Sequence, residues 1–135
     1  MRFYIPRLED EITFAFAFKQ NFVSGYTSFL TREPSKYAIE TLTKTSLWSL
    51  SYEDLQEIYQ ETQVGQALGR KASEALFLNK ARREQALLTQ TAEQRYMNLL
   101  TEQPEFIREI PLKYIASYIG ITPQALSRIR KRIYR

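Results

Sequence analysis

The side chains with the clearest chemistry lie in the final eight residues. Five of these are basic: Arg128, Arg130, Lys131, Arg132 and Arg135. Residues 108–135 hold seven basic side chains and one acidic one, whereas residues 1–107 hold 12 basic and 14 acidic ones. A cluster of positive charge on a near-neutral body favours a polyanionic partner, and nucleic acid is the commonest such partner. From charge alone, a solvated basic tail without a partner is the alternative.

The basic cluster continues a segment whose spacing fits two short helices joined by a tight turn. Residues 112–131 run LKYIASYIGITPQALSRIRK. A helix-turn-helix needs a small residue where the helices touch, here Ala116, and a residue that tolerates positive φ in the turn, here Gly120. The apolar side chains expected on the inward faces are Ile115, Ile119, Ile121, Leu126 and Ile129. An ordinary helical hairpin packed as core is the alternative.

In such a motif the second helix lies in the major groove of DNA. Arg128 has the forked donor that pairs with guanine, and Gln124 has the amide that pairs with adenine. The other polar side chains are better placed for phosphates, which fix register and supply salt-sensitive affinity. These phosphate candidates are Thr122, Ser127, Arg130, Lys131 and Arg132. On the first helix, Lys113, Tyr114 and Ser117 are expected to reach the flanking backbone.

The composition argues against most enzyme classes. The chain has no cysteine and no histidine, which removes disulfides, Cys/His zinc sites, thiol nucleophiles and Ser-His triads. The carboxylates of Glu53, Asp54 and Glu57 are expected on a solvated helix face and not as an acid–base pair. We therefore expect no enzymatic activity, no metal site and no cofactor.

Length and hydropathy indicate one compact domain or two very small ones. The 135 residues are 44% hydrophobic and 25% charged, as is typical of folded, soluble chains. No apolar run approaches the roughly 20 residues of a membrane span, and no basic segment precedes an apolar leader. The expected location is the cytoplasm, without a membrane partner.

The first fifty residues predict strands and the rest predicts helices, so the expected fold class is α+β. Phe14, Phe16 and Phe18 alternate with small residues, which is typical of a strand with one aromatic face. Further strands are predicted over 3–8, 37–43 and 47–50, with a hairpin loop at Glu9 and Asp10, while 22–30 is ambiguous. Capping boxes and prolines predict helices over 51–59, 64–89, 91–102, 111–119 and from 122 onward.

The predicted helix over residues 64–89 is apolar on two opposite sides. One side carries Leu68, Ala72, Ala75, Leu76, Asn79 and Ala86, and the other carries Phe77, Leu78, Ala81 and Leu88. One side can cover the sheet while the other meets a second copy of the chain, and a polar residue such as Asn79 at a heptad position fixes register. The first side is the expected dimer interface. A fully buried core helix is the alternative.

Taken together, these features resemble the Crp/Fnr family of bacterial transcription regulators. The resemblance rests on the aromatic-rich strands, the short helix, the long helix with two apolar sides and the segment IASYIGITPQALSRIRK. It covers essentially the whole chain and is sharpest over residues 110–133. It implies a cyclic-nucleotide-binding-like β-roll, a long dimerisation helix and a winged-helix DNA-binding domain. Gln124, Ser127 and Arg128 would then occupy the recognition positions.

The sequence departs from that family in three places. The family's phosphate-binding cassette has a ribose-binding Glu and a phosphate-binding Arg, whereas this chain has Gly25 and Ser35 there. Lys36 offers charge without the forked geometry of Arg. The β-roll starts well before the point that matches Met1, so the chain is expected to be N-terminally shortened, with only the second half of the roll. The strands of the wing after the recognition helix are expected to be missing or minimal.

The expected organisation is a partial β-roll with a short helix over 1–62, a dimerisation helix over 63–90 and a helix-turn-helix domain over 91–135. The expected function is transcription regulation by a homodimer that binds double-stranded DNA at an inverted-repeat operator, with a degenerate cyclic-nucleotide site. RNA polymerase is a further candidate partner. The alternative is a protein-interaction module that uses the unpaired edges and apolar face of the half-roll, without specific DNA binding.

Overall fold

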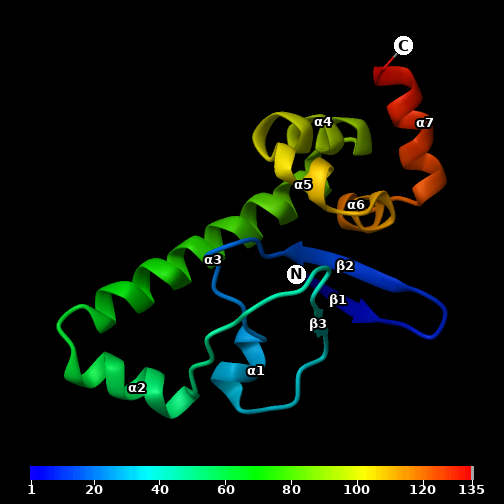
Figure 1. Ribbon diagram of the computed structural model, residues 1–135. Helices are drawn as coiled ribbons and strands as arrows, with labels where there is room; N and C mark the ends of the chain where they lie inside the picture. Colours follow the sequence, from blue (N-terminus) through cyan, green and yellow to red (C-terminus); the bar gives the residue numbers. More distant parts are fainter. Residues whose placement is uncertain (135) are drawn as a thin grey trace. The chain divides into compact units, whose positions relative to one another are not determined.

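The computed structural model describes residues 1–134 of an α+β chain (Figure 1). In chain order the elements are β1 (Arg2–Pro6), β2 (Glu11–Phe16), α1 (Tyr26–Thr31), β3 (Ala38–Glu40), α2 (Tyr52–Glu61), α3 (Gly65–Thr89), α4 (Ala92–Glu102), α5 (Pro104–Glu109), α6 (Leu112–Ile119) and α7 (Pro123–Ile133). Backbone contacts divide the chain into two units, the first formed by residues 1–44 and from 89 onward, and the second by residues 45–88. The strands thus share a unit with α4 to α7, whereas α2 and most of α3 form the other.

The sheet has three strands in the order β2-β1-β3, and both outer strands run antiparallel to β1. A short loop joins β1 to β2, so the predicted hairpin at Glu9 and Asp10 is confirmed. β3 covers only part of the predicted strand over 37–43. The prediction of a strand over 47–50 is wrong: this segment pairs with no described strand, and its Trp48 side chain is exposed.

A β-bulge splits the aromatic residues of β2. The pairing of β1 with β2 shifts by one residue at Phe14, between Thr13 and Ala15. Phe14 packs edge-on against Tyr37, with ring centroids 5.0 Å apart, whereas Phe16 packs edge-on against Phe106 at 5.2 Å. The prediction of one continuous aromatic face is therefore wrong, because a bulge interrupts the alternation of side chains along a strand.

Local sequence signals set most helix boundaries. Ser51 and Thr91 each form a capping box, with Asp54 and Gln94 respectively, and α2 and α4 begin at the next residue. These two predictions are confirmed. α1 falls in the segment that was ambiguous, and α5 was not predicted. α5 begins at Pro104, because proline at the first helical position suits the start of a helix.

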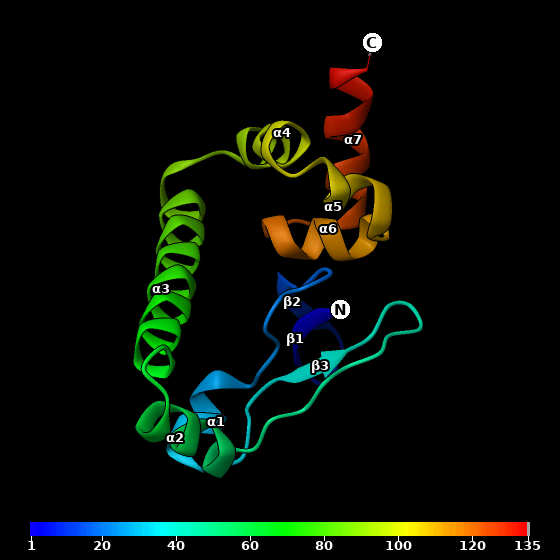
Figure 2. The same cartoon turned by 60° about the vertical axis from the view of Figure 1, so that its left-hand side comes forward.

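Most buried side chains of the first unit belong to one apolar cluster from α4 to α7. The cluster contains Tyr96, Leu99, Phe106, Ile110, Ile115, Ala116, Ile119, Leu126 and Ile129. Phe16 and Phe18 extend the cluster from the strand side, and Figure 2 shows α6 lying over β2. Helices on one side and the sheet on the other therefore fix the position of α6.

The second unit is a helical hairpin in which two glycines allow close approach. A Cβ built at Gly65 would lie 2.2 Å from the carbonyl oxygen of Ile58, and one built at Gly69 would lie 2.6 Å from the ring of Tyr59. Within α3, Gly65 is the buried residue, and Leu68, Phe77 and Leu88 are exposed.

We expect Gly65→Ala to loosen this hairpin. The added methyl group meets backbone atoms of α2, and overpacking of this kind costs about 1–3 kcal/mol, more than the roughly 1 kcal/mol that Ala gains over Gly within a helix. Amide hydrogen exchange along α2 should speed up. Gly69→Ala is the matched control, because its methyl group meets only the far end of the Tyr59 side chain, which can rotate away. Unchanged exchange in Gly65→Ala would contradict the expectation.

Candidate nucleic-acid interface

The turn between α6 and α7 has the conformation that the sequence predicts. Gly120 is left-handed, with φ 80°, and its N–H donates to the carbonyls of Ala116 and Ser117. The N–H of Ile121 also donates to the Ala116 carbonyl, at 3.0 Å. Ala116 is fully buried, so a larger side chain there would force its neighbours apart. The two helices cross steeply (Figures 1 and 2).

Thr122 and Pro123 fix the start of α7. The Thr122 hydroxyl accepts a hydrogen bond from the Ala125 N–H at 3.2 Å, and Pro123 occupies the first helical turn. A threonine that bonds in this way satisfies one of the free N–H groups at a helix N-terminus. The structure thus gives Thr122, expected at a phosphate, a role as the helix cap.

The two faces of α7 differ in polarity. Leu126 and Ile129 are buried in the apolar cluster. Four exposed side chains share the opposite face because they follow the spacing i, i+3, i+4 and i+7. We call them the outward face: Gln124, Ser127, Arg128 and Lys131. None of the 11 residues of α7 is acidic, so every charged side chain of the outward face is positive.

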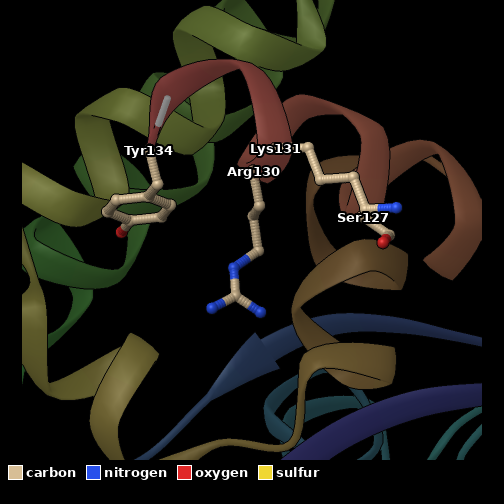
Figure 3. A pocket seen from close by; sticks show the side chains of 4 residues that line it. All are labelled: Ser127, Arg130, Lys131 and Tyr134. Atoms are coloured by element: carbon tan, nitrogen blue, oxygen red, sulfur yellow. The ribbon is translucent and has the colours of Figure 1, made fainter.

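The other two basic side chains expected at phosphates contact the protein. Arg132 forms an ion pair with Glu93 of α4 at 2.5 Å. Arg130 is half-buried, and its guanidinium carbon lies 5.9 Å from the centre of the Tyr134 ring. Figure 3 shows the Arg130 guanidinium extending away from α7, between Tyr134 and Ser127. Arg128 and Lys131 remain as the cations of the outward face.

The outer side of α6 is covered by the sheet. The N–H of Thr13 donates to the Ser117 hydroxyl at 2.8 Å. The Arg2 guanidinium lies 3.9 Å from the centre of the Tyr114 ring and forms an ion pair with Glu11 at 2.5 Å. The hydrogen bond and charge of Arg2 hold the pKa of Glu11 below its ordinary value. Tyr114 and Ser117, expected at the DNA backbone, are therefore engaged by β1 and β2, while Lys113 is exposed.

One positioning residue was missed by the sequence analysis. The Arg95 guanidinium of α4 donates twice to the Ile119 carbonyl, at 2.9 and 2.7 Å, and once to the Gln90 carbonyl. These bonds satisfy a free carbonyl at the end of α6 and hold it against α4. Nothing in the sequence distinguishes Arg95 from an exposed helix arginine, because its acceptor lies 24 residues away.

The expected dimer residues lie along α3 in the second unit. Leu68, Ala75 and Asn79 are exposed, whereas Ala72, Leu76 and Ala86 are half-buried. The stripe is continuous along the helix axis, as the spacing predicts. The stripe is therefore open at Leu68, Ala75 and Asn79 and partly covered at the other three positions.

The residues of the degenerate cassette lie together but do not fit a cyclic nucleotide. A Cβ built at Gly25 would lie 3.7 Å from the Ser35 hydroxyl, and that hydroxyl donates to the Tyr37 carbonyl at 2.7 Å. Lys36 is exposed. These positions offer neither a carboxylate for a ribose nor a guanidinium for a cyclic phosphate.

Calorimetry should therefore detect no micromolar binding of cyclic AMP. Loss of a charge-assisted bidentate contact weakens binding by at least about a hundredfold. A titration that fits a micromolar or tighter dissociation constant would contradict this expectation.

No helix within residues 1–134 combines the length and apolar character needed to cross a membrane. In the same part of the chain, no group of three or more Asp, Glu, Cys or His side chains is placed to hold a metal ion. No protein-family model, curated protein or solved structure matches this chain.

Proposed function

We propose that this chain is a sequence-specific DNA-binding transcription regulator that acts as a homodimer. The observation that carries the proposal is the outward face of α7. It presents Gln124, Ser127, Arg128 and Lys131 on an exposed surface without an acidic neighbour in the same helix, while the opposite face is anchored in the apolar cluster. In this proposal α6 and α7 form the helix-turn-helix, and α7 is the recognition helix.

The side chains of the outward face divide into two roles. Arg128 lies one turn beyond Gln124, at the middle of α7, and its fork matches the two acceptors of guanine in the major groove. Gln124 offers the matching donor and acceptor for adenine. Lys131 lies one turn further along and is a compact charge suited to phosphate. Arg132 is already paired with Glu93. In this proposal it attracts DNA by its charge and does not contact it directly.

The proposed dimer uses the stripe on α3. Two copies related by a two-fold axis present two recognition helices, so the preferred operator is an inverted repeat with half-sites about one helical turn apart. The resemblance to the Crp/Fnr family, with a partial β-roll and a degenerate cyclic-nucleotide site, supports the same arrangement.

One observation favours a second function, a protein-interaction module. Leu47, Trp48 and Leu50 form an exposed apolar segment, and exposed apolar surface marks interaction sites. In that case DNA binding would be weak and indifferent to sequence.

Binding titrations of two variants test the leading function. A duplex selected from a random library and a scrambled duplex are each titrated at several salt concentrations. Arg128→Ala should cost about 1–3 kcal/mol on the selected duplex and much less on the scrambled one, because it removes a base contact. Lys131→Ala should weaken both alike and lower the salt slope by about one.

The control is Arg70→Ala, which removes an exposed arginine from α3 that is paired with Glu74. It should leave both affinities unchanged. Equal losses on both duplexes for Arg128→Ala would make Arg128 a phosphate contact. If the unmodified chain binds the selected and the scrambled duplex equally, the protein-interaction module is the favoured function.

A further inference from the structure

A hollow on the side of α7 gathers positive charge and hydroxyl groups. It is lined by Ser127, Arg130, Lys131 and Tyr134 (Figure 3). These residues follow the spacing i, i+3, i+4 and i+7, so they form one continuous stripe of the helix. The lining thus offers a guanidinium, an ammonium and two hydroxyls, and none of these four described residues is acidic.

A buried tyrosine of α4 lies beside this hollow, next to Arg130 and Tyr134. Tyr96 of α4 is fully buried, and neither its Oη nor the Nε of Arg130 has a hydrogen-bond partner among residues 1–134. Burial raises the pKa of Tyr96, and the nearby hydroxyl and charge of Tyr134 raise it further. The charge and the donor groups of Arg130, which lie near the Tyr96 hydroxyl without full hydrogen-bond geometry, lower it. Tyr96 therefore keeps its proton at neutral pH and remains a donor. Buried donors without an acceptor are rare in folded proteins and are costly.

We propose that this hollow binds a phosphate group. Arg130 supplies forked donors and Lys131 a point charge, while the hydroxyls of Ser127 and Tyr134 complete the contacts. Phosphate fits better than a carboxylate because three or more oxygens can accept from this number of donors. The bound group would also give the Arg130 Nε–H the acceptor that it lacks.

Two sources can supply this chemistry, the backbone of duplex DNA or a free phosphate. Only the first source rests on the proposed function. The hollow adjoins the outward face, since Ser127 and Lys131 belong to both. A DNA strand along the outward face would therefore reach the hollow at Ser127 and Lys131, because Arg128 and Arg130 project from different sides of α7.

The test of the site is a titration of the full chain with inorganic phosphate. Sodium chloride holds the ionic strength constant, and NMR follows the Arg130 Nε–H and the amides of residues 126–134. Saturable shifts should occur with phosphate and not with chloride alone. Arg130→Met and Lys131→Met should each weaken binding at least tenfold, whereas Arg108→Met, which removes an exposed arginine from α5, should not. Circular dichroism checks that each variant is folded. If Arg130→Met does not fold, the result for Lys131→Met decides the test.

A second set of titrations distinguishes the sources. If a backbone phosphate fills the hollow, a duplex displaces inorganic phosphate, and phosphate weakens duplex binding more than chloride does. If phosphate stays bound beside the duplex, the site takes a free phosphate. The site would be overturned if phosphate causes no saturable shift, or if Lys131→Met and Arg108→Met lose phosphate affinity equally. Neither outcome would affect the duplex titrations of Arg128→Ala. Phosphate binding in a chain that does not bind DNA would overturn the proposed function and leave the site standing.

Discussion

A chain that carries both Ala72→Lys and Leu76→Lys should sediment as a monomer, in contrast to the dimer expected of the unmodified protein. Both side chains lie on the α3 stripe and are half-buried already in the single chain. In the proposed dimer each lysine would meet its two-fold mate, so that four ammonium groups would be desolvated at one interface. Each unpaired buried charge costs several kcal/mol, which is enough to dissociate a complex with a nanomolar dissociation constant. Binding to an inverted repeat should fall to the level of a single half-site.

The matched control for this variant is Phe77→Lys with Leu88→Lys. It adds the same charge to the same helix but on the opposite side, where both side chains are exposed. Sedimentation and light scattering should still show a dimer. A dimer that survives the first pair of substitutions and is lost with the second would move the interface to the other side of α3.

Ile115→Ala should lower the free energy of unfolding by about 3 kcal/mol, within the range for isoleucine truncation in a packed core. Ile115 is fully buried and lies within the apolar cluster on α6. Its loss leaves a cavity between elements that approach from both sides, so local collapse cannot fill the space. Urea unfolding followed by circular dichroism measures the change.

Leu112→Ala on the same helix is the control. Leu112 is 38% exposed, so its truncation should cost less than about 1 kcal/mol. Near-equal losses for the two variants would mean that the cluster does not hold α6 in place. DNA affinity at a temperature where both variants are folded should be nearly unchanged, because neither side chain belongs to the outward face of α7.

Sequence by itself determined the features that depend on neighbouring residues. The capping boxes at Ser51 and Thr91 set the starts of α2 and α4, and Gly120 ends α6 because its left-handed conformation suits glycine. Amphipathic spacing likewise predicted the burial of Leu126 and Ile129 and the exposure of Arg128. Each of these outcomes is fixed within about one turn of helix.

Tertiary structure alone decided which polar side chains of the site are bound by other groups of the protein and which stay exposed. Arg130 and Arg132 are neighbours of Lys131 and have similar chemistry in the sequence. Only the position of α4 places Glu93 beside Arg132 and Tyr96 beside Arg130. The sequence could not show that the Ser117 hydroxyl accepts from Thr13 either, because 104 residues separate them.

The bulge at Phe14 has the same origin. A period of two in the sequence fixes side-chain alternation only while pairing with the next strand stays in register. The shift occurs where Phe14 packs against Tyr37 and Phe16 against Phe106, contacts that join segments far apart in the chain. Local periodicity carries no information on such contacts, because hydrogen-bond partners and packing surfaces are set only when distant elements meet.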